Sequence, residues 1–390
     1  MTLTGSALLL TAVFLTLALF IGAIVGLPLI RGRRWVTFAG RALVLVVLNA
    51  FVLLTAGIVF NDNYGFYSDW TDLHNSLFGS GAVSSISLHA GGSAGGAAGG
   101  GRATGSLGTG QAGRVLAYQV TGRRSGLRGQ VLVTLPPGYH SPANATRRYP
   151  VIETFPGYPA TPAQWFVNMN LGGFLRDAEQ VDEIGPVITI SPETEFPGGI
   201  DNECVNGLRG EPKVETWLTR DVPSWAERMY RVHAGRASWA TLGMSAGAWC
   251  AAMAPMLHPA QYAAGIVMGG YFQPEFSNNY RPFGPDSPQA GRYDLIALAH
   301  RDPPPVALWI ETSRGDPVSY PSSTQLLAAA RAPLSIQAVE LKHAGHRFGV
   351  WGALLPRALT WLGAHIPGFH PDDHAIERAS KLGPTALGRG

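Results

Sequence analysis

The sequence predicts an α/β fold: a mostly parallel, doubly wound sheet with an antiparallel N-terminal edge, preceded by an N-terminal two-helix transmembrane hairpin. Three observations lead to this prediction. Strand-like apolar runs alternate with helical segments over residues 114–366, an order typical of parallel sheets covered by helices. The segment Trp239–Cys250 places the pattern G-x-S-x-G between a short apolar strand and an Ala-rich helix. Two long apolar runs come before all of this.

The amino-acid composition excludes some classes of protein. The 390 residues are 46% hydrophobic and only 14% charged, which is low for a soluble protein and indicates membrane-embedded or low-complexity sequence. Residues 1–60 hold four arginines and no acidic residue, so the net charge of +3 leaves −1 for the rest of the chain. That balance excludes a basic surface for nucleic acid. Two cysteines make no metal site by themselves, and no cofactor or metal is expected.

The first 60 residues are predicted to form two transmembrane helices. The run Ala7–Ile30 carries no charge and would be about 36 Å long as a helix, enough for a hydrocarbon core of about 30 Å. A second run, Leu43–Phe60, would reach about 27 Å, and more if residues 35–42 continue it. A cleaved signal peptide is the alternative. Met1–Ser6 has no Lys or Arg, however, and the first run is longer than the apolar part of a signal peptide.

The loop between the two runs predicts the orientation in the cell membrane. It contains Arg31, Arg33 and Arg34, and positively charged loops stay in the cytoplasm. Everything after Phe60 is therefore expected on the extracytoplasmic side.

Composition also marks the remaining boundaries. Residues 61–113 are predicted to be a linker. Its polar and aromatic first part, Asn61–Phe78, suits a membrane interface, and its Gly/Ser/Ala-rich second part, Gly79–Gly113, is typical of a flexible tether. Residues 114–367 are predicted to be the catalytic domain, and 368–390 a disordered tail.

Within the folded domain, periodicity and turn residues predict the elements in order. Two runs rich in β-branched residues, Val115–Thr121 and Gln130–Thr134, predict a hairpin. A buried strand follows at Pro150–Thr154, and further strands at Val187–Ser191, Trp239–Leu242, Ala264–Gly270, Val306–Glu311 and Ile336–Leu341. Helical periodicity predicts helices at Val214–Val232, Ala246–His258, Tyr293–His300, Ser323–Arg331 and Phe348–Leu362. A long loop, Pro192–Gly210, follows the second buried strand.

The G-x-S-x-G segment is predicted to be a nucleophile elbow. Such a turn holds the serine in a strained backbone conformation that costs about 1–3 kcal/mol. Gly243 and Gly247 would be required because strand and helix approach too closely for a Cβ. The alternative is an ordinary turn, since a chain with 49 glycines produces this pattern by chance.

Four segments together carry a family resemblance: Leu135–Tyr139, Glu215–Pro223, Gly243–Gly247 and Gly345–Phe348. In order and spacing they resemble the esterase D / antigen 85 branch of the α/β-hydrolase superfamily, over roughly Arg114–Ile366. The resemblance implies the α/β-hydrolase fold. It also implies either hydrolysis of carboxylic esters or transfer of an acyl group to a cell-envelope glycolipid.

The residues after Ser245 predict the other members of a catalytic triad. A serine hydroxyl needs a base to take its proton and an acid to orient that base, and α/β-hydrolases place them in the order Ser, Asp or Glu, His. Asp316 follows one later strand and His346 the next, at the strand ends where open α/β sheets assemble their sites. Glu311 is the alternative acid and His343 the alternative base. The choice of Asp316 departs from antigen 85 proteins, whose acid is a glutamate elsewhere in the chain.

Two backbone N–H groups are predicted to form the oxyanion hole. One is that of Ala246, directly after the nucleophile. The other is that of Tyr158, in the loop after Pro150–Thr154. The family usually has His-Gly in that loop, where this chain has Pro156-Gly157. The alternative is that the loop is only a turn.

Further residues are weaker candidates. An extracytoplasmic domain permits a disulfide between Cys204 and Cys250; two buried thiols are the alternative. Asp201 and Glu203 are candidates to bind substrate hydroxyls or a cation, or are simply solvated. Trp165 and Tyr271 are candidates to line an acyl pocket, although most aromatic residues are core.

The leading hypothesis is therefore a membrane-anchored, extracytoplasmic serine esterase whose partners are the membrane and an ester or acyl-lipid substrate. An acyltransferase that uses a sugar or lipid hydroxyl is the first alternative. A catalytically inactive hydrolase fold that serves as a binding module is the second. The sequence leaves the oligomeric state and the acyl specificity open.

Overall fold

The structure is a computed structural model that describes residues 6–64, 67, 70, 73, 105–109, 113–208, 210–277 and 280–372. The chain divides into two compact units. One unit comprises Met1–Gly81 with the short segments Ser313–Val318 and Leu341–Arg347, and the other comprises the remaining residues.

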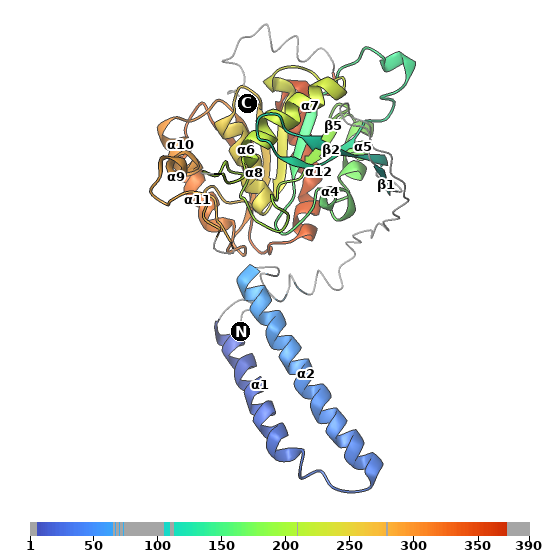
Figure 1. Cartoon of the computed structure of the whole chain (residues 1–390), viewed down its shortest axis with the longest axis vertical. Coiled ribbons are helices and arrows are strands. Elements are labelled where there is room, and N and C mark those ends of the chain that lie inside the picture. Colours follow the sequence, from blue (N-terminus) through green and yellow to red (C-terminus); the bar gives the residue numbers. More distant parts are fainter. Residues whose placement is uncertain are drawn as a thin grey trace. The chain divides into compact units, whose positions relative to one another are not determined.

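The N-terminal helices α1 (Ser6–Gly26) and α2 (Arg34–Tyr64) run side by side as a hairpin (Figure 1). Ala7–Gly26 and Arg34–Asn61 are long and apolar enough to cross a membrane. The second span is longer than its most apolar run because residues 35–42 continue the helix. The hydroxyls of Thr16 and Thr55 lie 2.8 Å apart across the pair.

The larger unit is built on a sheet with the strand order β1-β2-β3-β5-β4-β6-β7-β8-β9. The strands are β1 (Gly105–Thr109), β2 (Gly113–Thr121), β3 (Arg128–Thr134), β4 (Val151–Phe155), β5 (Ile188–Pro192), β6 (Trp239–Met244), β7 (Ala264–Met268), β8 (Ala307–Ser313) and β9 (Ser335–Leu341). Pairing is antiparallel from β1 to β5 and parallel from β5 through β4, β6 and β7 to β8.

The last strand, β9, runs in the same direction as β8. Ser335 N–H at its start donates to Val306 O just before β8, and Arg314 N–H just after β8 donates to Leu341 O at its end. The expectation of a mostly parallel sheet with an antiparallel N-terminal edge is thus confirmed. In such a sheet the carboxyl ends of the parallel strands meet at one edge, where active sites are assembled.

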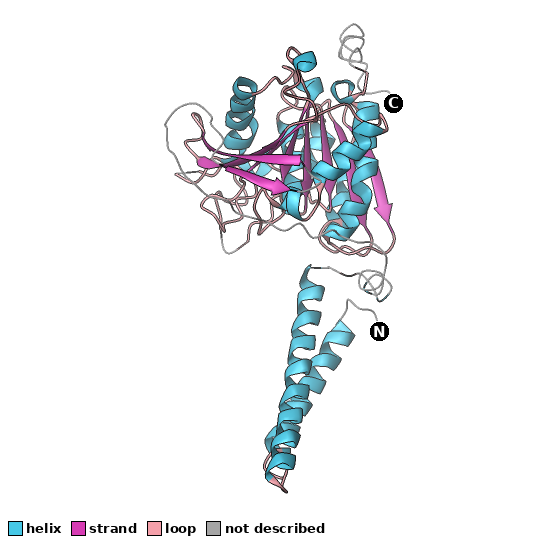
Figure 2. Cartoon of the chain, turned by 90° about the vertical axis from the view of Figure 1, so that its right-hand side faces the viewer, coloured by secondary structure: helices cyan, strands magenta, loops and turns pink. Residues whose placement is uncertain are grey.

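Helices flank the sheet on both of its faces (Figure 2). They are α4 (Gln164–Val167), α5 (Leu171–Gln180), α6 (Val214–Thr216), α7 (Val222–Met229), α8 (Ala246–Leu257), α9 (Pro288–Arg292), α10 (Leu295–Arg301), α11 (Tyr320–Ala329) and α12 (Phe348–His365). Helix α8 packs on β6 and β7, and α5 packs against α12. The residues of β4, β5, β6 and β7 are all buried, because both faces of these strands are covered.

The helix expected over Val214–Val232 is interrupted. A turn of π-helix, Trp217–Asp221, separates α6 from α7. Pro223 has no N–H to continue the regular hydrogen-bond ladder, which accounts for the wider turn before it. The Asp221 carboxylate beside it accepts hydrogen bonds from the N–H groups of Arg124 and Ser125 and so fixes the turn between β2 and β3.

Two segment boundaries differ from expectation. Strand β1 lies within the stretch expected to be a flexible tether and pairs with β2 along its whole length. Backbone hydrogen bonds hold β1 to β2, so this pairing does not require large side chains. Near the C-terminus, Gly368 and Phe369 are buried in a short 3₁₀ turn, Pro367–Phe369, rather than in a tail. Most of the tether and residues 373–390 lie outside the described residues.

Candidate active site

Ser245 occupies a strained turn between β6 and α8. Its φ of 55° and ψ of −128° lie outside the regions that L-residues normally adopt. A Cβ on Gly243 would lie 1.9 Å from Gly247 O, and a Cβ on Gly247 would lie 2.1 Å from Phe155 O. Both glycines are therefore required by close backbone approach. The turn has the backbone strain and the close packing expected of a nucleophile elbow.

The residues expected to supply the oxyanion hole line one small cavity. Ala246, at the start of α8, and Tyr158, in the loop after β4, both line it. Between β4 and Tyr158, Pro156 has no N–H, and the N–H of Gly157 donates to Gln164 Oε1 at 3.0 Å. Tyr158, the residue predicted to supply the second oxyanion donor, follows directly after Gly157 in this loop.

Asp316 and His346 form a hydrogen-bonded pair. His346 Nδ1 lies 2.9 Å from Asp316 Oδ2, and the two residues are 8% and 3% exposed. Asp316 Oδ1 accepts a second hydrogen bond from Val318 N–H at 2.9 Å, which fixes the plane of the carboxylate. The alternative base, His343, is exposed. The alternative acid, Glu311, is a buried residue within β8.

A residue that sequence reasoning missed joins the loops of this pair. Ser313 Oγ, at the end of β8, accepts hydrogen bonds from Gly315 N–H at 3.2 Å and from Ala344 N–H at 3.1 Å. The first donor lies next to Asp316 and the second lies two residues before His346. No sequence signal distinguishes Ser313 from other serines at strand ends, because the bond to Ala344 spans 31 residues.

The long loop after β5 is fastened to the elbow helix. Cys204 and Cys250 form a disulfide, and Trp249 Nε1 donates to Glu203 O at 2.6 Å. Glu203 and Cys204 both have positive φ, 50° and 52°. Backbone strain of this kind persists only where the surroundings hold it in place, and here two neighbouring residues of α8 do so.

The two aromatic residues expected to line an acyl pocket are instead part of the core. Trp165 is fully buried in α4, and Tyr271 is 5% exposed. The Tyr271 hydroxyl donates to Glu203 Oε1 at 2.6 Å, so it supports the loop. How deeply they are buried depends on how α4 and the loops pack, which residue type alone does not reveal.

Carboxyl side chains line the cavity beside Ala246. They are Glu195, Asp201 and Glu203. Burial raises the pKa of Asp201, and burial with the nearby charge of Asp201 raises the pKa of Glu203 well above its ordinary value. Among the described residues, no group of three or more His, Cys, Asp or Glu is arranged to hold a metal ion.

Glu215, in one of the segments that carry the family resemblance, is the centre of a buried hydrogen-bond network. Its carboxylate accepts hydrogen bonds from Arg292 and Tyr293 and lies 2.6 Å from His258 Nε2. The Tyr293 hydroxyl in turn accepts from Asn206 N–H at 2.8 Å, which ties the network to the loop after Cys204. Burial alone would raise the pKa of Glu215, but these hydrogen bonds outweigh it and lower the pKa from 4.5 to about 2.

Replacing Glu215 by glutamine is expected to lower the free energy of unfolding at pH 7 by about 3 kcal/mol, because the side chain, 2% exposed, loses the negative charge that pairs with Arg292. The folded-state pKa is lowered, so this stabilisation is present above about pH 4.5 and is lost as the pH falls toward 2. Thermal unfolding of both proteins from pH 7 to pH 3 measures it. The exposed Glu227 on α7, changed to glutamine, is the control. If the difference in the free energy of unfolding between wild type and the Glu215 variant does not shrink as the pH falls, the prediction is contradicted.

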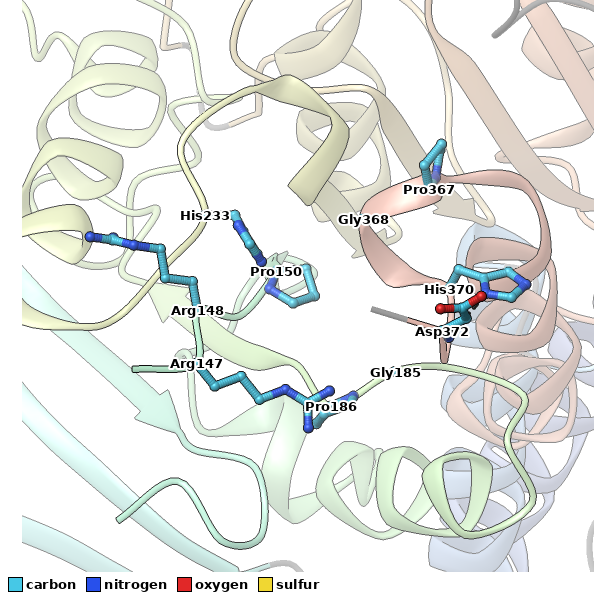
Figure 3. A pocket seen from close by; sticks show the side chains of 10 residues that line it. All are labelled: Arg147, Arg148, Pro150, Gly185, Pro186, His233, Pro367, Gly368, His370 and Asp372. Carbon is cyan, nitrogen blue, oxygen red and sulfur yellow. Dashed lines mark hydrogen bonds between the residues drawn. The ribbon is translucent and has the colours of Figure 1, made fainter. Parts of the chain in front are cut away.

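A second hollow lies at the opposite edge of the sheet, before the amino ends of β4 and β5 (Figure 3). Its charged lining residues are Arg147, Arg148 and Asp372, with His233 and His370. Figure 3 shows that Arg147 and Asp372, of opposite charge, lie on different sides of it. The hollow therefore has no single charge preference, and it lies away from the strand ends that carry Ser245 and Asp316.

Comparison with known proteins places this architecture among esterases. The family model described as "Putative esterase" matches residues 124–362, which fall within the region of the family resemblance. An uncharacterized protein of Corynebacterium glutamicum is 30% identical over 142 residues, which are 36% of this chain and 32% of that protein. The chain thus matches about a third of the length of this curated relative.

Solved structures with the same fold include three hydrolases. An S-formylglutathione hydrolase from Agrobacterium tumefaciens has a TM-score of 0.57 at 13% identity, over 68% of this chain and 99% of that one. A ferulic acid esterase has a TM-score of 0.54 at 18% identity, over 64% of this chain and 96% of that one. A fluorophosphonate-binding serine hydrolase from Staphylococcus aureus has a TM-score of 0.51 at 12% identity, over 64% of this chain and 97% of that one.

Proposed function

Because the chain belongs to the Putative esterase family of the α/β-hydrolase superfamily and is a serine hydrolase, we propose that it cleaves carboxylic esters through a triad of Ser245, His346 and Asp316. The observation that carries the proposal is the strained elbow at Ser245, together with the Asp316–His346 pair. Ser245 follows β6 and Asp316 follows β8. These strands belong to one parallel sheet with β7 between them.

In the proposed reaction His346 is the general base. Its Nδ1 is occupied by Asp316, so Nε2 takes the proton of Ser245 Oγ as that oxygen attacks the ester carbonyl carbon. The N–H groups of Ala246 and Tyr158 bind the resulting oxyanion. His346 then returns the proton to the leaving alcohol as the C–O bond breaks, which leaves an acyl group on Ser245. Water, deprotonated by the same histidine, releases the acid and regenerates the serine.

Labelling with a fluorophosphonate tests the triad, since such probes bond covalently to an activated serine. The full chain is expected to be labelled, and Ser245→Ala and His346→Ala are expected to abolish labelling while circular dichroism stays unchanged. Labelling that survives Ser245→Ala, or no labelling of the wild type, would point instead to another nucleophile or to an inactive fold that serves as a binding module.

Acyl transfer to a hydroxyl-bearing acceptor is a second candidate reaction. It is favoured by the carboxyl groups of Glu195, Asp201 and Glu203 around the cavity that Ala246 and Tyr158 also line. Carboxyl oxygens accept hydrogen bonds from hydroxyls, as a sugar or lipid acceptor would require. Product analysis with a short p-nitrophenyl ester, with and without trehalose, distinguishes the reactions: acylated trehalose supports transfer, and free acid alone supports hydrolysis.

The N-terminal hairpin is proposed to anchor the enzyme in the cell membrane, with the catalytic domain outside the cytoplasm. Support comes from the two membrane-length helices, from Arg31, Arg33 and Arg34 in or beside the turn between them, and from a disulfide suited to an oxidising compartment. Protease added to intact cells is expected to digest residues 114–390. Protection in intact cells, with digestion only after permeabilisation, would reverse the orientation.

A further inference from the structure

The segment after β7 builds a groove of its own, which we call the aromatic groove. It has a volume of about 520 Å³, within the usual range for small-molecule sites. Its apolar lining residues are Pro274, Phe276, Phe283, Pro285, Ala290 and Gly291. Among the described residues, the polar lining consists of Gln273, Arg281 and Asp294.

One wall of the groove is held rigidly to the core. The ring of Phe283 meets that of Phe276 edge to face at 5.3 Å and stacks on the ring of Tyr293 at 5.6 Å. The Tyr293 hydroxyl is fixed by Glu215 and by Asn206 N–H. The groove is therefore formed before any ligand arrives, which lowers the entropic cost of binding.

The charges at the groove balance. Asp294 Oδ1 is used to cap α10, where it accepts from Ala297 N–H at 2.8 Å. Arg281 Nη1 donates to Tyr280 O at 2.6 Å. One cation and one anion, each already bonded to backbone, give no preference for a charged ligand. The apolar walls instead favour an uncharged hydrocarbon.

A short segment connects the groove to residues that contact the elbow helix and the cavity beside it. Tyr271 is hydrogen-bonded to Glu203, which lines the cavity beside Ala246, and a Cβ on Gly270 would lie 2.8 Å from Ala248 Cβ on α8. Gln273, the first residue of the groove, is only two residues beyond Tyr271, at most about 7 Å along the chain.

We propose that the aromatic groove binds the alkyl chain of the acyl group that is transferred to Ser245, so that the enzyme prefers medium-length fatty acyl esters to acetyl esters. This inference rests on the proposed esterase function and adds the acyl class to it. Each buried methylene contributes about 0.8 kcal/mol, so kcat/KM should rise about fourfold per CH₂ until the groove is filled.

Filling the groove from within tests the assignment. Gly291 lies on α9 in the lining, and a Cβ there has no neighbour within 4 Å, so Gly291→Trp projects a large ring without a backbone clash. Gly284, in the same segment but outside the lining, has the same open surroundings, and Gly284→Trp is the matched control. The full chain in lipid nanodiscs is assayed with p-nitrophenyl acetate, butyrate, hexanoate, octanoate and benzoate.

The wild type and Gly284→Trp are expected to prefer octanoate, and Gly291→Trp to lose at least tenfold in kcat/KM for octanoate while acetate is unchanged. An identical chain-length profile in Gly291→Trp and wild type would overturn the assignment, as would a loss confined to benzoate, which indicates an aryl pocket.

Fluorophosphonate labelling of Ser245 in the same samples reports the triad separately. If labelling fails, saturation-transfer NMR of sodium octanoate still decides: equal binding by wild type and Gly291→Trp refutes the groove. If Gly291→Trp misfolds, Phe276→Ala is expected to flatten the chain-length profile, and an unchanged profile refutes the groove equally.

Discussion

Changing Asp316 to asparagine is expected to lower kcat by about 10⁴-fold, equivalent to about 5.5 kcal/mol of transition-state stabilisation. An asparagine keeps the size of the side chain and the Oδ1 contact with Val318 N–H. Its amide nitrogen, however, then presents an N–H donor to His346 Nδ1 in place of the carboxylate oxygen. The histidine then adopts the wrong tautomer to accept the proton of Ser245. Steady-state kinetics on p-nitrophenyl esters measure the loss.

The control for this prediction is Glu311→Gln, which tests the alternative acid. Glu311 is a buried residue of β8, five positions before Asp316, and its replacement is expected to change kcat by less than tenfold. A greater loss in Glu311→Gln than in Asp316→Asn would transfer the role of triad acid to Glu311. Thermal unfolding of both variants shows whether either loss of activity comes from misfolding.

Removing the disulfide by replacing both Cys204 and Cys250 with alanine is expected to cost about 2–4 kcal/mol of stability, because the bridge closes a loop across a separation of 46 residues. For a domain of this size the melting temperature should fall by about 5–15 °C. The loop also carries Glu203, which is bonded to Trp249 and Tyr271 beside the elbow. Activity at 25 °C is therefore expected to fall as well, chiefly through a higher KM.

Reduction provides the comparison for this second prediction. A reducing agent should lower the melting temperature of the wild type to that of the double variant and leave the double variant unchanged. Equal melting temperatures of wild type and double variant in the absence of reductant would show that the bridge does not stabilise the loop.

The sequence alone was enough to predict the parallel sheet and the sharp turn at Ser245, and it also proposes an order for the site residues. Gly243 and Gly247 mark the elbow because a local steric requirement selects glycine at those two positions. The strands are recognisable because burial on both faces selects unbroken apolar runs. A chain order of Ser245, Asp316 and His346 follows from the connections of such a sheet. The hydrogen bond between the last two agrees with that order.

Local pattern could not reveal what depends on contacts between distant segments. Trp165 and Tyr271 were expected to line a pocket and are buried core residues. Ser313 joins two loops across 31 residues, and Glu215 joins Arg292 across 77. In the aromatic groove, Phe283 stacks on Tyr293, whose hydroxyl donates a hydrogen bond to Glu215.

The residues proposed to carry the chemistry thus lie in short segments whose residue types are selected locally, by strain at a turn or by burial of a strand. The surroundings of the site, including the fastened loop, the buried carboxyl groups and the groove proposed to bind the acyl chain, are decided by the tertiary structure. They depend on packing and hydrogen bonds between residues far apart in the chain, which leave no periodic or spaced pattern in the sequence.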